Sequence, residues 1–76
     1  MGVLEDLADG LAKDALDAGD ALGDNEYYRE VAKVIGASST TLEEAFLTSI
    51  RIRLAERRGR AFLKSSLSKI AKQTAQ

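Results

Sequence analysis

No proline, cysteine, histidine or tryptophan occurs anywhere in the 76 residues of this chain. Without proline, every helical position keeps its backbone donor, and the abundant Ala, Leu, Glu, Lys and Arg favour helices. Without cysteine and histidine, the chain excludes disulfides, thiolate or imidazole metal sites, cysteine nucleophiles and a Ser-His-Asp triad. We therefore predict one all-α domain over residues 1–76, a small bundle of three or four helices with a helical hairpin.

Residues 3–22 have the clearest helical spacing. At 100° per residue, their apolar side chains fall within roughly 80° of one another; these are Leu4, Leu7, Leu11, Ala15, Ala18 and Leu22. The opposite face carries Asp6, Asp9, Lys13, Asp17 and Asp20. We predict that the leucine face packs on the rest of the fold and that these four aspartates stay free.

The next helices are predicted over residues 25–35, 41–58 and 60–73. Residues 23–25 break the first helix and supply caps for the second, and Gly36 suits a left-handed helix end. Thr40 with Glu43, or Thr41 with Glu44, would form a capping box for the third helix. Two alternatives remain open for the last two segments, which either break near Gly59 or form one long C-terminal helix that serves two surfaces.

Residues 42–54 are apolar on several sides, which indicates burial on several sides. One face carries Phe46, Leu47, Ile50 and Leu54, and another carries Leu42, Ala45 and Ile52. This is more apolar surface than two short helices can cover. We therefore predict a homo-oligomer or a protein partner, with the first of these faces in the contact.

The charges are divided along the chain. Residues 1–28 hold eight acids and one base, a net charge of −7, and residues 51–76 hold eight bases and one acid, a net charge of +7. Four bases form a stripe at spacings of 4, 3 and 4 residues, namely Arg53, Arg57, Arg60 and Lys64. The two charged regions either pair loosely within one molecule or meet a second molecule. We assign this stripe and the acids Asp6, Asp9, Asp17 and Asp20 to partner binding.

Other classes of function have little support in the sequence. Ser65, Ser66 and Ser68 lie near Lys64 and Lys69, but this is common composition in a helix, so we predict no catalysis. No EF-hand loop or glycine-rich phosphate loop is present. No run approaches the ~18 apolar residues of a membrane span, although residues 57–72 form a plausible surface helix. We expect no cofactor, no metal and a cytoplasmic location.

Residues 28–47 contain a helix, a short Ser/Thr turn and a second helix. Seven residues of this segment are small or apolar at positions where a helix-turn-helix needs small or apolar side chains. They are Val31, Ala32, Ile35, Gly36, Ala37, Leu42 and Ala45. This segment resembles the helix-turn-helix of DNA-binding regulators. The resemblance implies that Ser38, Ser39, Thr41 and Glu44 would approach DNA. A nucleic-acid site would consist of Ser38, Ser39 and Thr41 together with the later bases Arg51 and Arg58.

Glu43 and Glu44 place negative charge where phosphates would approach, and the strongly basic residues begin only at Arg51. We therefore predict a non-enzymatic helical interaction protein, that is, an assembly subunit, adaptor or inhibitor that binds itself or another protein. The alternative is a small helix-turn-helix regulator whose DNA binding is weak.

Overall fold

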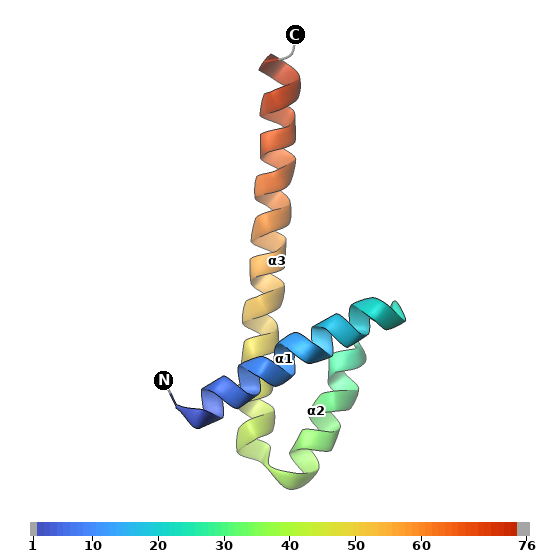
Figure 1. The fold of residues 1–76 in the computed structure, drawn as a ribbon, viewed down its shortest axis with the longest axis vertical. Helices are drawn as coiled ribbons and strands as arrows, with labels where there is room; N and C mark the ends of the chain where they lie inside the picture. The colour runs from blue at the N-terminus through green and yellow to red at the C-terminus, as the bar shows by residue number, and fades with distance from the viewer. Residues whose placement is uncertain (1, 75–76) are drawn as a thin grey trace.

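The computed structural model describes residues 2–74, which form three helices (Figure 1). Helix α1 spans Val3–Leu22, α2 spans Tyr27–Ser38 and α3 spans Thr40–Thr74. Helix α2 and the first half of α3 form a hairpin, and α1 lies across both. The predicted all-α fold, the hairpin and the long C-terminal helix are confirmed.

Helix α3 is continuous through Gly59 and contains 35 residues. Of the two alternatives for residues 41–73, the single long helix is therefore the one observed. A glycine in a helix interior costs only about 1 kcal/mol relative to alanine. No capping residue follows Gly59 to start a new helix, so a continuous helix costs less free energy than a break at Gly59.

The ends of α2 and the start of α3 differ from the predictions. Helix α2 continues through Gly36 to Ser38, and Gly23, with φ of 70°, is the only residue with positive φ in residues 2–74. The Leu42 backbone N–H donates to Ser39 Oγ at 3.1 Å. Ser39 therefore caps α3, and the predicted capping boxes at Thr40 and Thr41 are wrong, because the chain reverses one residue earlier.

The α1–α2 turn is held by close backbone contacts. Gly23 ends α1, and the Asp24 N–H donates to the Gly19 carbonyl at 2.9 Å. A Cβ at Gly19 would lie 2.7 Å from the Asp24 carbonyl oxygen, so only glycine allows this approach. The Glu26 N–H donates to Asp24 Oδ1 at 2.9 Å. This bond fixes the turn, and α2 starts two residues later than predicted.

The core is small and rich in alanine. Its buried apolar residues are Ala8, Ala12, Ala15, Leu16, Ala32, Phe46 and Ile50. The predicted leucine face of α1 is wrong, because Leu7 and Leu22 are 57% and 65% exposed. The buried face is turned by about 80° from it, at 100° per residue. Small side chains on this face let α1 lie close to α3 and cover Phe46 and Ile50.

The second half of α3 extends beyond the body formed by α1, α2 and the first half of α3 (Figure 1). The molecule measures 58 Å along its longest axis and 13 Å along its shortest. Between Ala55 and Lys72, every residue except the half-buried Ser66 is exposed. We refer to residues 58–72 as the α3 tail. No helix within residues 2–74 has the length and apolar character needed to cross a membrane.

Candidate partner-binding surfaces

The predicted apolar binding face of α3 is the core of the chain itself. Phe46 and Ile50 are 0% and 1% exposed, and Leu47 and Leu54 are half-buried against them. Helices α1 and α2 both pack on this face. Phe46 and Ile50 are therefore not available to a partner in this fold, because α1 covers them, whereas a partner contact through the half-buried Leu47 and Leu54 stays a prediction.

Two arginines of the basic stripe bind aspartates of α1. Arg53 Nε and Nη2 donate to the two carboxylate oxygens of Asp9, both at 2.8 Å. Arg57 Nη1 and Nη2 donate to the two oxygens of Asp20 at 3.2 and 3.0 Å. These bidentate pairs join α1 to α3 on the same side of the core.

The prediction that Asp9 and Asp20 stay free is therefore wrong, whereas partner binding by Arg53 and Arg57 stays a prediction. The physical reason is the rotation of α1. Because its alanine face is buried, Asp9 and Asp20 lie beside the core instead of opposite to it, within reach of α3.

The electrostatic effect of these pairs is visible in the ionisation of Asp9. The Arg53 guanidinium donates hydrogen bonds to Asp9 and holds the pKa of that carboxyl below its usual 3.8. The pKa of Arg53 is raised by the same contact. Along α1, the Lys13 ammonium lowers the pKa of Asp17, whose Oδ2 lies 2.8 Å from Nζ.

The remaining charges of the predicted site are less constrained. Arg60 Nε lies 2.9 Å from Glu56 Oε2 within α3, so this pair is local to one helix. Asp6 and Lys64 form no ion pair within residues 2–74. Of the eight charged residues assigned to partner binding, these two keep their charge available to a second molecule.

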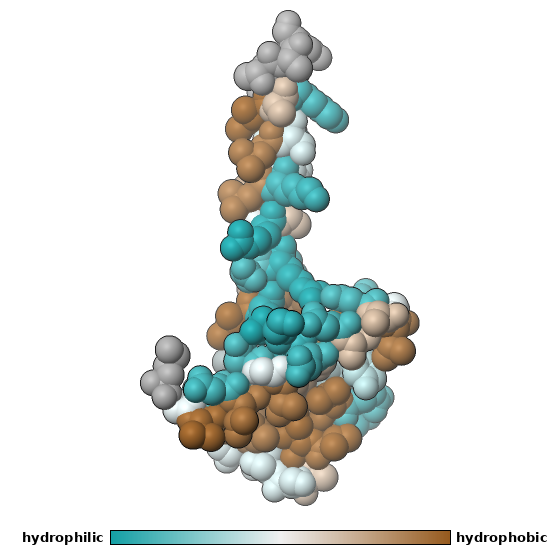
Figure 2. All heavy atoms as spheres, in the orientation of Figure 1, coloured by the Kyte–Doolittle hydropathy of each residue, from teal (hydrophilic) through white to brown (hydrophobic). Residues whose placement is uncertain are grey.

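A line of exposed apolar side chains runs along α3 from the body into the tail. Its members lie within about 60° of one another at 100° per residue. They are Ile52, Leu63, Leu67 and Ile70, which are 64%, 57%, 64% and 56% exposed. We call these four residues the apolar edge. Figure 2 shows apolar side chains along one edge of the projecting helix, with hydrophilic side chains beside and between them.

The apolar edge begins at a groove between α1 and α3. The groove has a volume of about 420 Å³ and is lined by Glu5, Asp6, Asp9, Ala45, Thr48, Ser49 and Ile52. Three carboxylates from the start of α1 therefore border a small apolar floor from α3. We call this feature the acidic groove, and Ile52 belongs to both the groove and the apolar edge.

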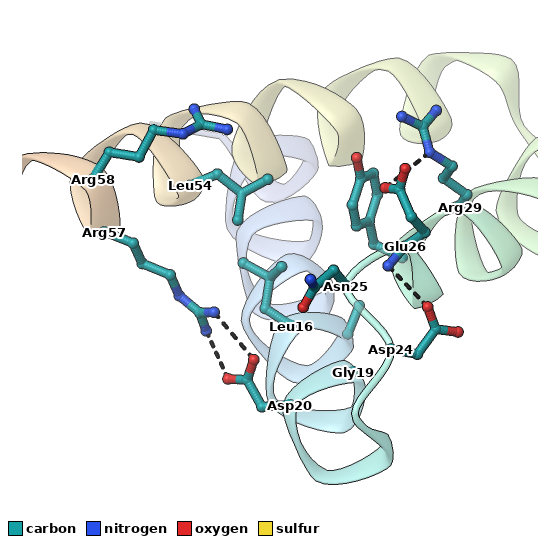
Figure 3. A pocket seen from close by; sticks show the side chains of 12 residues that line it. Leu16, Gly19, Asp20, Asp24, Asn25, Glu26, Arg29, Leu54, Arg57 and Arg58 are labelled. Carbon is teal, nitrogen blue, oxygen red and sulfur yellow. Dashed lines mark hydrogen bonds and ion pairs between the residues drawn. The ribbon is translucent and has the colours of Figure 1, made fainter. Parts of the chain in front are cut away.

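A second cavity, of about 510 Å³, lies between the α1–α2 turn and α3 (Figure 3). Arg57 binds Asp20 at its border, and Glu26 Oε2 lies 3.1 Å from Arg29 Nε. Leu16 and Leu54 form its apolar part. These charges are satisfied by one another and fix the start of α2, so the cavity shows no set of groups converging on a ligand.

The residues of the helix-turn-helix resemblance lie on two elements. Ser38, Thr41, Arg51 and Arg58 are exposed, whereas Ser39 is half-buried and uses its hydroxyl as a helix cap. Ser39 alone joins α2 to α3, whereas the turn of a DNA-binding motif has three or four residues. Arg51 and Arg58 are seven residues apart and share one face of α3. DNA binding through these residues stays a prediction.

Sequence reasoning missed the exposed leucine face of α1, for which the signal was the high alanine content of the neighbouring face. It did separate Leu63, Leu67 and Ile70 from the core, since they lie about 130° from the Phe46–Ile50–Leu54 face at 100° per residue. Comparisons of the chain with protein-family models, curated proteins and solved structures gave no match.

Proposed function

We propose that this chain is a small non-enzymatic protein-interaction protein, an assembly subunit, adaptor or inhibitor, and that the α3 tail is its binding element. One observation carries the proposal. The tail presents Leu63, Leu67 and Ile70 to solvent along one line, and it projects beyond the other helices.

The energetics of an isolated helix support this assignment. A helix of about 15 residues without tertiary contacts is marginal in water, and the tail begins next to a helix-weakening glycine, Gly59. Burial of a leucine or isoleucine side chain stabilises by about 1.5–3 kcal/mol. A partner that covers the three apolar residues of the tail would therefore stabilise a helix that is only marginally stable by itself.

The charge of the tail indicates the type of partner. Residues 58–72 contain five basic residues and no acid, a net charge of +5. An acidic surface with an apolar centre would match this tail, because complementary charge guides both encounter and orientation. Arg60 and Lys64 of the predicted stripe belong to this tail, whereas Arg53 and Arg57 form ion pairs with α1.

Site-specific photo-crosslinking in the source cells tests the proposal. Benzoylphenylalanine at position 67 places the reactive group on the apolar edge, and the same residue at the exposed position 65 places it on the far side of the tail. We expect a protein adduct from position 67 and little or none from position 65. Absence of adducts at position 67, or equal yields from both positions, would contradict the assignment of the tail.

A further inference from the structure

We propose that the partner of the α3 tail is a second copy of this chain, with the two α3 helices antiparallel and their apolar edges in contact. This inference rests on the proposed function and names its partner. Each tail then runs along the body of the other copy and ends near the other copy's acidic groove.

The spacing of the apolar edge permits this pairing. In an antiparallel pair that crosses between residues 59 and 63, Ile52 of each copy opposes Ile70 of the other. Gly59 opposes Leu63 in the same register, and Leu67 opposes Ala55. The paired segment of 19 residues would be about 28 Å long at 1.5 Å per residue. The exposed apolar members of both edges are thus covered in one contact, which also contains the Glu56–Arg60 ion pair between Ile52 and Leu63.

Electrostatics selects the antiparallel over the parallel arrangement. In a parallel pair, two tails of charge +5 would lie side by side along their whole length. In the antiparallel pair, the two tails overlap only over residues 58–64, and the end of each tail, with Lys69 and Lys72, approaches the three carboxylates of the other copy's acidic groove. Like charges at an interface are unfavourable and opposite charges favour association, so the antiparallel pair is preferred.

The contact between the two copies ends at the acidic groove. Glu5, Asp6 and Asp9 border the floor formed by Ala45 and Ile52. Asp6 forms no ion pair within residues 2–74 and is available to an incoming base. The incoming tail carries its apolar edge with Lys64 on one side and Lys69 on the other.

Gly59 acquires a role in this arrangement. Nothing lies within 4 Å of the position that a Cβ would take at Gly59, so no contact within the chain requires glycine there. A helix-interior glycine costs about 1 kcal/mol relative to alanine. At the crossing point of two helices it allows the backbones to approach, and the side chain of Leu63 from the second copy would fill the space.

A second copy satisfies more of the exposed surface than an anionic membrane does. A lipid surface would cover the basic, apolar tail but would repel the carboxylates of the acidic groove. A second copy covers both apolar edges and places the end of each basic tail at an acidic groove in one symmetric contact. For this reason a second copy is the preferred partner.

Sedimentation equilibrium of the pure full-length chain gives the first test. We expect a monomer–dimer equilibrium that Leu67→Asp weakens at least about tenfold, a change of about 1.4 kcal/mol. The matched control Ser65→Asp, on the far side of the tail, should leave the equilibrium nearly unchanged. Circular dichroism checks that both variants keep the helical fold. A strictly monomeric wild type, or a dimer indifferent to Leu67→Asp, would overturn the proposal.

The register is tested by disulfide formation, because the chain has no native cysteine. Ala55→Cys and Ser66→Cys lie on the same flank of the apolar edge and nearly oppose each other in the antiparallel register. Oxidation of an equal mixture should give mainly the mixed 55–66 disulfide, and Ser65→Cys mixed with Ala55→Cys should give little. A yield of the 55–66 disulfide no higher than that of the 55–65 disulfide would overturn the proposed register.

The two proposals fail in different ways. Adducts from position 67 to another protein, with a monomeric pure chain, would overturn self-pairing and leave the interaction function standing. A monomeric pure chain that binds vesicles of phosphatidylglycerol, with no protein adducts, would overturn both in favour of a membrane-surface helix. Adducts from position 67 to a second copy would support both proposals.

Discussion

The two halves of α3 belong to one uninterrupted helix but have opposite surroundings. Residues 40–57 lie against α1 and α2, bury Phe46 and Ile50, and direct Arg53 and Arg57 to aspartates of α1. The tail carries similar residue types, with Phe62, Leu63, Lys64 and Leu67, and leaves them all exposed. Residue type therefore did not decide which apolar and basic side chains stabilise the fold. The position of α1 decided it, because α1 reaches only the first half of α3.

The two phenylalanines give the strongest test of this comparison. Phe46→Ala removes a fully buried ring and should destabilise the fold by about 3–5 kcal/mol. Phe62→Ala removes a ring that is 71% exposed and should change stability by less than about 0.5 kcal/mol. Urea denaturation at low protein concentration measures both. Similar losses from the two substitutions would show that the tail is packed on the body.

Two glycines give the next largest contrast. Gly19→Ala places a methyl group against the Asp24 carbonyl and should destabilise by about 1–3 kcal/mol. Gly59→Ala has open space around it and should stabilise the isolated chain by up to about 1 kcal/mol through helix propensity. Thermal unfolding at low concentration separates the two effects. If Gly59→Ala also strengthened self-association, the close helix crossing at Gly59 would be wrong.

The ion pairs of the two halves should differ in their response to pH. The folded-state pKa of Asp9 lies below its usual 3.8, so the Arg53 pair stabilises above that value and is lost as the pH falls through the lowered pKa. Between roughly pH 5 and pH 2, wild type should lose more stability than Arg53→Gln. Arg60→Gln, which breaks only a contact within α3, should follow wild type. Carboxyl chemical shifts of Asp9 in wild type and Arg53→Gln provide the direct measurement.

The smallest expected effect is the binding of duplex DNA. The acids of α1 repel a polyanion over a Debye length of about 8–10 Å, and Arg53 and Arg57 are already paired. We expect weak binding of random duplex DNA that disappears between about 50 and 200 mM salt. Fluorescence anisotropy at the two salt concentrations measures it. Tight, sequence-selective binding would favour the helix-turn-helix function and would assign the exposed bases of the tail to phosphate contacts.

The sequence by itself determined the helices and the division of charge. The absence of proline, the 3.6-residue spacing of apolar side chains and Gly23 at the end of α1 each act locally, so local reasoning was sufficient for them. The separation of Leu63, Leu67 and Ile70 from the Phe46–Ile50 face was also a matter of helical geometry.

Only the tertiary structure decided which face of each helix is buried. The leucines of α1 are more apolar than its alanines, but the alanine face allows α1 to approach α3 closely and cover Phe46 and Ile50. That choice turned α1 by about 80°. The rotation brought Asp9 and Asp20 to Arg53 and Arg57 and left Leu7 and Leu22 exposed. Packing density and ion-pair geometry depend on contacts between segments that are far apart in the sequence. The spacing of residues along one helix therefore does not determine them.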